Sequence, residues 1–285
     1  MTLLPTTLLV LLHGTVFSAD VRSADVLSAQ LVPPGAEQHF LSPARVFQPW
    51  AEQPVRWFGA FEFDTGLLYV RPRFELGYGR PHASWVGVDL NPIFSEEGVA
   101  GYAGLRIAQP FWHLRVGGRY WLTFYRSFLQ PRDSYSVEEI ELQQGPRSRF
   151  LTWEAELGVN LPLGPGGLLA ELAGSYVSGV DAGYYVYEET LRVVVEPPWV
   201  WRTRLGYLWA LAGGALQLGP VVELVAVPRR DTWVLRAGGL VRIALSGDLE
   251  ARGTFVPALA TPDALGAKGG DAFLLGIRYR WASGL

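Results

Sequence analysis

Arginines recur at every second position in several parts of the chain, for example Arg71 and Arg73, and Arg202 and Arg204. Successive side chains of a β-strand point to opposite faces, so two residues separated by one share a face. A guanidinium group carries five N–H donors and binds a carboxylate or a phosphate through two parallel hydrogen bonds. If these segments are strands, their arginines line a surface that can bind anions.

One histidine–serine pair has the spacing of a candidate catalytic site. His82 and Ser84 stand two apart, and a histidine beside a serine can act as the base that activates the hydroxyl as a nucleophile. The pair is similar to the His-x-Ser of outer-membrane lipid hydrolases, but that motif continues with Asn, whereas Trp85 follows here. A chance match is favoured, and His82 and Ser84 are kept as an alternative site.

The remaining acids and histidines do not form a catalytic or metal-binding pattern. Glu154 and Glu156 share a strand face and could act as a general acid and base, but a role as countercharges for arginines explains them more simply. His13, His39 and His113 lack metal-ligand spacing, and the chain has no cysteine. We therefore expect no catalytic residues, no metal and no cofactor.

The composition is typical of an all-β chain with a large apolar surface. The 285 residues include 33 Gly, 11 Trp, 12 Tyr and 14 Phe, and hydrophobic residues make up 49% against 18% charged residues. No run of about 18 apolar residues is present that could form a transmembrane helix. The net charge of −3 argues against nucleic acid as a partner, because nucleic-acid binders carry basic patches.

The amino-terminal segments differ from the rest of the chain. Residues 1–19 combine a short apolar run with small residues at Ser18 and Ala19, which predicts a cleaved signal peptide and export to the periplasm. Residues 20–54 contain several prolines and no sustained period, so we expect an irregular periplasmic or plug segment. Residues 55–285 then form one further domain.

From residue 55 onward, apolar and polar residues alternate with a period of two. In the segment 150–161, Leu151 and Trp153 share one face, whereas Thr152 and Glu154 share the other. Turn-forming residues separate the alternating segments, beginning with Asp64–Gly66. Twelve strands are expected, over Arg56–Phe63, Leu67–Gly79, Trp85–Asn91, Val99–Ile107, Phe111–Arg126, Phe150–Leu161, Gly167–Ser178, Val200–Leu211, Leu216–Val227, Trp233–Leu245, Leu249–Val256 and Phe273–Trp281.

The last expected strand carries the most specific pattern. Gly276, Tyr279 and Trp281 stand in the order Gly-x-Arg-Tyr-x-aromatic near the carboxyl end. This order resembles the closing strand of Gram-negative outer-membrane β-barrels, whose end is read by the barrel-insertion machinery. The resemblance is to this class rather than to one family, and it implies that these three residues form an insertion signal with that machinery as a partner. In this chain four residues follow the aromatic that normally ends the strand.

Three further features favour a membrane barrel over a soluble β-sandwich, whose strands also alternate. Several strands run for about 12 residues, enough to cross a bilayer at a tilt. The three longest connections all fall at the end opposite five short turns, as they do in such barrels, although the short connections Asp64–Gly66 and Pro228–Asp231 also fall at the extracellular end. The apolar faces carry no charge, and aromatics suited to the lipid headgroup region mark their ends: Tyr78, Trp112, Trp153, Trp201, Trp209, Trp233 and Trp281. We predict a single antiparallel, transmembrane, up-and-down β-barrel of about 12 strands, with short periplasmic turns and longer extracellular loops, in contact with outer-membrane lipid.

The polar faces of these strands would line the barrel lumen with twelve arginines and seven acids. The arginines are Arg71, Arg73, Arg106, Arg115, Arg119, Arg202, Arg204, Arg236, Arg242, Arg252, Arg278 and Arg280, and the acids are Glu75, Asp89, Glu154, Glu156, Glu171, Glu223 and Glu250. Further acids, Glu188 and Glu189 among them, fall in predicted outer loops, where they compensate this charge. The positive excess favours a passage for anions, whereas pairing between the two sets would fill the lumen with salt bridges.

We therefore expect a non-enzymatic outer-membrane protein that acts as a narrow, porin-like channel for small anionic solutes. One alternative is a closed barrel that serves as a subunit of a cell-envelope assembly, with a periplasmic or envelope protein as partner. A second alternative is a lipid hydrolase that uses His82 and Ser84. An open lumen lined by arginines favours the channel, and a lumen packed with ion pairs favours the closed barrel.

Overall fold

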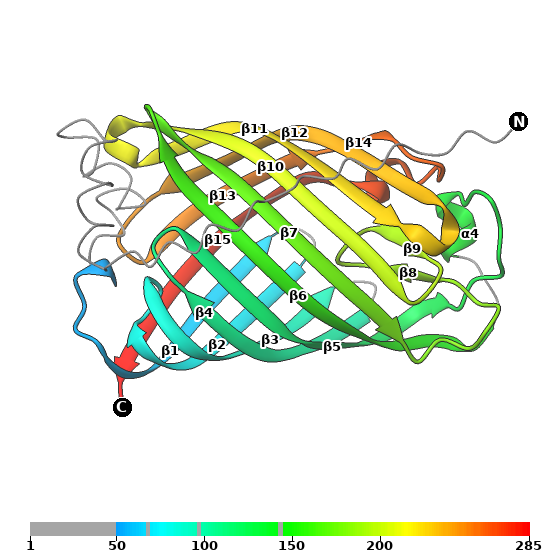
Figure 1. The fold of residues 1–285 in the computed structure, drawn as a ribbon, viewed down its shortest axis with the longest axis horizontal. Coiled ribbons are helices and arrows are strands. Elements are labelled where there is room, and N and C mark those ends of the chain that lie inside the picture. Colours follow the sequence, from blue (N-terminus) through cyan, green and yellow to red (C-terminus); the bar gives the residue numbers. More distant parts are fainter. Residues whose placement is uncertain (1–49, 67–68, 96–97, 142–144) are drawn as a thin grey trace, which may run out of the picture. The chain divides into compact units, whose positions relative to one another are not determined.

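The computed structural model describes residues 50–66, 69–95, 98–141 and 145–285, in which twelve long antiparallel strands close into a barrel (Figure 1). The barrel strands are β1 (Arg56–Gly66), β2 (Tyr69–Arg80), β3 (Ser84–Ser95), β4 (Gly98–Ala108), β5 (Trp112–Ser127), β6 (Arg147–Leu163), β7 (Gly166–Ser178), β10 (Trp199–Leu211), β11 (Leu216–Val227), β12 (Thr232–Ala244), β13 (Leu249–Val256) and β15 (Asp271–Gly284). Three short strands accompany them, β8 (Val186–Glu188), β9 (Val193–Val195) and β14 (Ala258–Ala260). Among the described residues, no helix has the length and apolar character needed to span a bilayer. The predicted fold class is confirmed.

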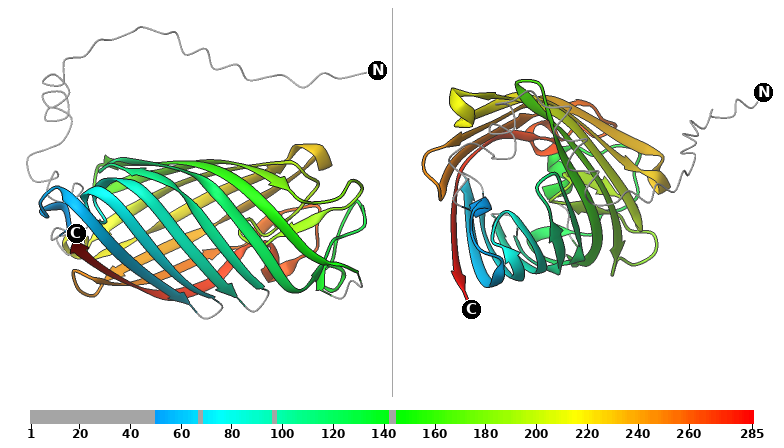
Figure 2. Two further views of the ribbon diagram at one scale, coloured as in Figure 1. Left: turned by 90° about the horizontal axis from the view of Figure 1, so that it is seen from below. Right: turned by 60° about the vertical axis from the view of Figure 1, so that its left-hand side comes forward.

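The barrel closes through its first and last strands. β1 pairs with β15 from Phe58 opposite Gly284 to Gly66 opposite Gly276, and β13 pairs with the other edge of β15. Figure 2 shows the strands inclined around the closed wall. Closure pairs both edges of β15, which suits a strand in lipid, where unpaired backbone N–H and C=O groups are costly. Of the predicted insertion signal, Tyr279 and Trp281 lie on the outer face of β15, and Gly276 faces the other way.

The outer face of the wall is apolar and exposed. Leu76, Leu205 and Ile277, for example, are 52%, 53% and 48% exposed. The seven aromatics predicted for the headgroup regions are between 39% and 54% exposed. A continuous apolar exterior of this kind, around a polar interior, is suited to a lipid bilayer and not to water. The protein is an outer-membrane β-barrel.

The two ends of the barrel differ. Short turns join β2 to β3, β4 to β5, β6 to β7, β10 to β11 and β12 to β13, and they form the periplasmic end. The long connections follow β5, β7 and β13 at the extracellular end, where the helix α4 (Val137–Glu141) and the β8–β9 hairpin lie (Figure 1). The order of short turns and long loops agrees with the prediction.

The predicted signal peptide, residues 1–19, lies outside the described residues, and so does most of the segment 20–54. Residues 50–54 are described, and they lie against the periplasmic turns. Trp50 Nε1 donates a hydrogen bond of 3.0 Å to the carbonyl oxygen of Gly247, and Arg80 Nε donates one of 3.0 Å to that of Gln53. These contacts tie the chain before β1 to the turns after β12 and β2.

Two segments predicted to be turns or loops are strand in the structure. Asp64–Gly66 continues β1, with Asp64 opposite both Arg71 and Arg278. Of Pro92–Gly98, predicted as a loop, the residues as far as Ser95 belong to β3. In both places, pairing with two neighbouring strands outweighs the local turn preference of Asp, Gly and Pro. As a consequence, Asp64 faces the lumen.

Leu205→Arg tests the lipid-facing assignment, because Leu205 is at the middle of β10 and 53% exposed. We expect a loss of about 2–4 kcal/mol in the free energy of unfolding, since a guanidinium at the bilayer midplane is costly. The matched change, Leu163→Arg at the periplasmic end of β6, where Leu163 is 58% exposed, should cost only about 0–1 kcal/mol. Denaturant titration in lipid vesicles measures both, and equal losses would contradict the assignment.

Candidate functional site in the barrel lumen

The lumen is lined by buried charges. Glu62, Asp64, Glu75 and Asp89, on β1 to β3, are at most 5% exposed. An isolated charge in such a place costs several kcal/mol, so each carboxylate needs cationic partners. The arginines of neighbouring strands supply them.

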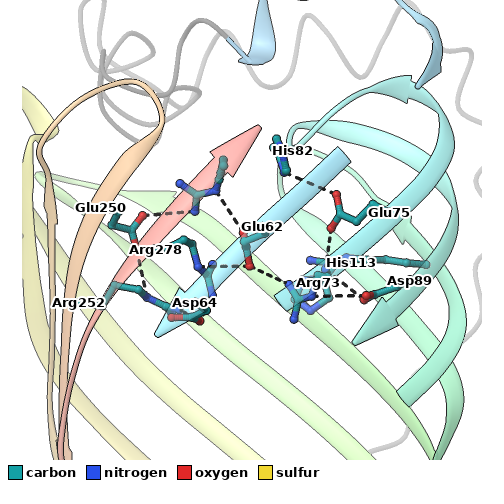
Figure 3. A network of polar contacts seen from close by, with 12 residues as sticks. Glu62, Asp64, Arg73, Glu75, His82, Asp89, His113, Glu250, Arg252 and Arg278 are labelled. Atoms are coloured by element: carbon teal, nitrogen blue, oxygen red, sulfur yellow. Dashed lines mark hydrogen bonds and ion pairs between the residues drawn. The ribbon is translucent and has the colours of Figure 1, made fainter. Parts of the chain in front are cut away.

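The first group of ion pairs crosses the seam where the barrel closes (Figure 3). The carboxylate of Glu62 lies 3.2 Å from Arg73 and 3.3 Å from both Arg278 and Arg280. Asp64 accepts a hydrogen bond of 2.8 Å from Arg278. Because β1 contributes the acids and its two neighbours the arginines, these pairs join β15, β1 and β2 from the inside.

The second group lies across the lumen on β5 to β12. Its main ion pairs are Arg115–Glu156 at 3.2 Å, Arg202–Glu156 at 2.9 Å, Arg204–Glu223 at 2.5 Å and Arg236–Glu223 at 2.5 Å. Glu171 lies 3.6 Å from Arg202 and 3.7 Å from Arg204. Most of these arginines therefore form ion pairs with carboxylates of the wall, and their side chains fill space in the lumen.

The β8–β9 hairpin enters the lumen from the extracellular end. Glu188, which is fully buried, lies 3.2 Å from Arg119 and accepts hydrogen bonds from Trp121 Nε1 at 3.1 Å and from the Leu191 N–H at 2.6 Å. The guanidinium of Arg236 donates to the Leu191 carbonyl oxygen at 2.8 Å. These side-chain contacts hold the hairpin, since β8 and β9 pair with each other in a sheet separate from the barrel wall.

Apolar packing completes the closure at this end. Val186, Val193 and Val195 of the hairpin are at most 1% exposed, and they pack with wall residues such as Phe150 and Val225. Above them, the loops form a second apolar cluster around Tyr135 and Leu265. An ion pair of 2.6 Å between Arg230 and Asp263 holds these loops together.

The structure brings most of the predicted lumen residues together. Ten arginines lie within 3.6 Å of a carboxylate oxygen: Arg73, Arg106, Arg115, Arg119, Arg202, Arg204, Arg236, Arg252, Arg278 and Arg280. Glu154, Glu156, Glu171 and Glu223 are among the partners, and Arg71 also has an interaction partner. Arg242 differs, because it lies opposite Gln217 and Arg252 and pairs with no acid in the described part of the chain.

Three acids that line the lumen were not predicted from the sequence to do so. Glu62 and Asp64 were missed because they were read as a weak strand and a turn, although their spacing of two matches Arg71 and Arg73 on the next strand. Glu188 was assigned to an outer loop, and it lies instead in the lumen beside Arg119. Its position depends on how a long loop folds back, which no local pattern encodes.

The alternative catalytic pair does not have the geometry of a nucleophile and its base. His82 Nδ1 lies 3.6 Å from Glu75 (Figure 3). Its Nε2 lies 3.2 Å from the carbonyl oxygen of Trp281. Both ring nitrogens therefore face groups other than Ser84. Burial lowers the pKa of His82 to about 4, so the ring is neutral at neutral pH.

No family model matches the chain, and no curated protein does. Among solved structures, the barrel is similar to the NanC porin, with 8% identity and a TM-score of 0.36 over 80% of this chain and 99% of that one. It is also similar to a loop L8 deletion mutant of OmpT, an outer membrane protein of Vibrio cholerae, with 7% identity and a TM-score of 0.37 over 80% and 99% of the two chains. TM-scores this low support no statement about activity or solute. The assignment to the outer membrane follows from the molecule's own apolar exterior and closed wall.

Glu188→Gln tests whether the buried ion pair holds the hairpin. The change keeps the side-chain shape but removes the charge that faces Arg119, so we expect hydrogen exchange at the backbone amides of residues 186–195 to speed up about tenfold or more. Glu196→Gln is the control, because Glu196 faces Arg229, a side chain that is 65% exposed. Equal exchange in both variants would show that apolar packing alone holds the hairpin.

Because the pKa of His82 is lowered in the folded protein, the free energy of unfolding decreases as the pH is lowered. Between about pH 4 and pH 6.5 the unfolded chain binds a proton at His82 that the folded protein excludes, so unfolding becomes easier as the pH is lowered through this range. Between pH 7 and pH 5 this contribution is about 2 kcal/mol. His82→Asn, which suits the positive φ of 57° at this turn, should flatten the profile by that amount. Denaturant titrations of both proteins at pH 7 and pH 5 measure the change in the free energy of unfolding. If the intact protein and the His82→Asn variant change by the same amount, the low pKa of His82 is contradicted.

Proposed function

We propose that the protein is a narrow, non-enzymatic channel for small anionic solutes, closed in this conformation by the segment 179–198. The observation that carries the proposal is the independence of the β8–β9 hairpin. Its backbone forms no ladder with the barrel wall, so it can leave the lumen without the loss of any wall strand pairing. An element of this kind is suited to gating, whereas a permanently closed barrel needs only wall side chains to fill it.

The preference for anions rests on the arginines that the wall acids do not fully neutralise. Arg242 faces the lumen without an ion pair in the described residues, and the neighbouring Arg252 is the most exposed of the paired lumen arginines, at 28%. A cationic group with unused donors on a pore wall attracts anions and repels cations. β12 and β13 therefore form the side of the lumen along which an anion would pass.

A closed barrel that serves as a subunit of an envelope assembly is the second candidate, and the density of ion pairs in the lumen favours it. Under this proposal, a periplasmic or envelope protein would bind the periplasmic end or the extracellular loops. Both proposals need outer-membrane lipid and the barrel-insertion machinery as partners. They differ in whether removal of the hairpin opens a path for ions.

Replacement of residues 180–197 by Gly-Ser-Gly tests the channel. A short link can join β7 to β10, because Tyr176 stands opposite Trp199 and the Val177 N–H donates to the Pro198 carbonyl oxygen at 2.7 Å. In planar bilayers, we expect the intact protein to be closed for most of the time and the shortened one to give stable current steps. A salt gradient should show preference for anions, and Arg242→Gln in the shortened protein should weaken it.

Circular dichroism and the heat-dependent mobility of the folded barrel on gels check that the shortened protein folds. The milder variant Glu188→Gln, which keeps the whole chain, should give brief openings. If the shortened protein is folded and silent, the ion pairs alone close the lumen, and the closed-barrel proposal replaces the channel. Current steps that prefer cations would also overturn the proposal.

A further inference from the structure

The periplasmic end of the lumen contains a cavity of about 290 Å³, separate from the hairpin. Its wall includes Arg73, Arg106, Arg278, Arg280, Trp50 and Trp85. The volume is at the lower end of the range for small-molecule sites, so a ligand of one ring or a short chain would fit. The cavity lies at the end that carries the short turns, and a solute in the periplasm reaches it first.

The charged side chains around the cavity are mostly arginines, and these are more exposed than the acids beside them. The side chains of Arg73, Arg106, Arg278 and Arg280 are 13% to 20% exposed, whereas those of Glu62 and Glu75 are 7% and 4% exposed. Glu62 and Glu75 also line the cavity, but the four guanidinium side chains are the more exposed and outnumber them. A concave site with low-dielectric walls strengthens this potential, which attracts anions.

Arg106 is the cation best placed to bind a ligand. Its Nη1 lies 3.7 Å from Glu75 and 3.6 Å from Asp89, which is too far for good hydrogen bonds. Its buried Nε donates to no group among the described residues. A guanidinium has five N–H donors and binds a carboxylate with two of them in parallel. Arg106 therefore keeps N–H donors for a ligand, while the nearby carboxylates of Glu75 and Asp89 balance its charge.

Two tryptophans give the cavity an apolar side. Trp85 is buried against Phe58, with ring centroids 5.7 Å apart, and Arg106 lies over its ring at 5.8 Å. Trp50 packs edge-on against His82 at 4.7 Å, and its Nε1–H is used by the Gly247 carbonyl oxygen. Both rings are therefore held in place and line the cavity, and Trp50, the more exposed of the two, offers most of the contact to a flat apolar group.

We propose that this cavity binds a small organic carboxylate from the periplasm, with Arg106 holding the carboxylate and Trp50 and Trp85 contacting its flat body. The inference rests on the proposed function in that it names the solute class of the anion channel. Binding, however, can be measured without current. A failed conductance experiment and a failed binding experiment are therefore distinguishable.

Isothermal titration calorimetry of the whole refolded barrel in detergent, with benzoate as the probe, tests the site. We expect benzoate to bind and its neutral counterpart benzamide not to. Arg106→Gln should weaken benzoate binding by about tenfold or more, because charge-assisted hydrogen bonds are lost. Arg106→Lys, which keeps the charge but not the planar fork, should give an intermediate affinity.

Arg229→Gln is the matched control, since Arg229 lies at the extracellular end and its side chain is 65% exposed. Trp50→Leu should weaken benzoate and leave inorganic phosphate, an anion without a flat body, unaffected. The proposal is overturned if benzamide binds as well as benzoate, if Arg106→Gln binds benzoate like the intact protein, or if phosphate alone binds. The heat-dependent gel mobility of each variant checks that the barrel has folded.

Discussion

A charge buried inside the wall is costly without a partner, and most of the lumen charges of this barrel are paired. At the seam, Glu62 stands opposite Arg280 and Asp64 opposite Arg278, so the acids of the first strand meet the arginines of the last. A slip of one residue in this pairing would turn the charges of one of the two strands toward lipid and its apolar residues toward the lumen. The ion pairs therefore do more than fill the interior. They also set the register in which β1 pairs with β15. The apolar face alone would allow this register to shift by two residues, since such a shift keeps every side chain on the same face.

The same constraint accounts for closure of the lumen, but two different kinds of interaction take part. Wall ion pairs such as Arg204–Glu223 connect neighbouring strands and cannot be given up without leaving a buried charge. The hairpin is held by its buried valines, by hydrogen bonds from Arg236 to the carbonyl oxygens of Leu191 and Arg192, and by the ion pairs Glu188–Arg119 and Glu189–Arg126. Without the hairpin, Arg119 would keep its contact with Glu154 of the wall, whereas Arg126 would lose its ion pair with Glu189. The hairpin is thus the part of this closure that lies outside the strand pairing of the wall.

The sequence was sufficient for the wall because a strand between lipid and a polar lumen must alternate. Leu216–Val227 and Leu249–Val256 were predicted with the bounds that the structure has, and the other barrel strands differ by a few residues at their ends. Local rules failed where pairing overrides turn preference, as at Asp64–Gly66. They had no access to Glu188 or to the periplasmic cavity, since both arise from contacts between residues far apart in the chain. Trp50 and Gly247, for example, are 197 positions apart.

The cavity and the hairpin occupy opposite ends of the lumen, yet one series of close ionic contacts joins them. The series begins at His113, which lines the cavity and lies 3.3 Å from Glu156. Arg115 lies 3.2 Å from Glu156 and 3.1 Å from Glu154. Arg119 contacts Glu154 and lies 3.2 Å from Glu188 of the hairpin. A contiguous series is not by itself a coupling, because coupling requires an element with two arrangements that both ends can bias. His113, Arg115, Arg119, Glu154 and Glu156 all belong to β5 or β6, whose pairing fixes them in the wall. Within this series Glu188 alone belongs to an element outside the wall ladder, so Arg119–Glu188 is the one contact of the series that can change without a loss of strand pairing.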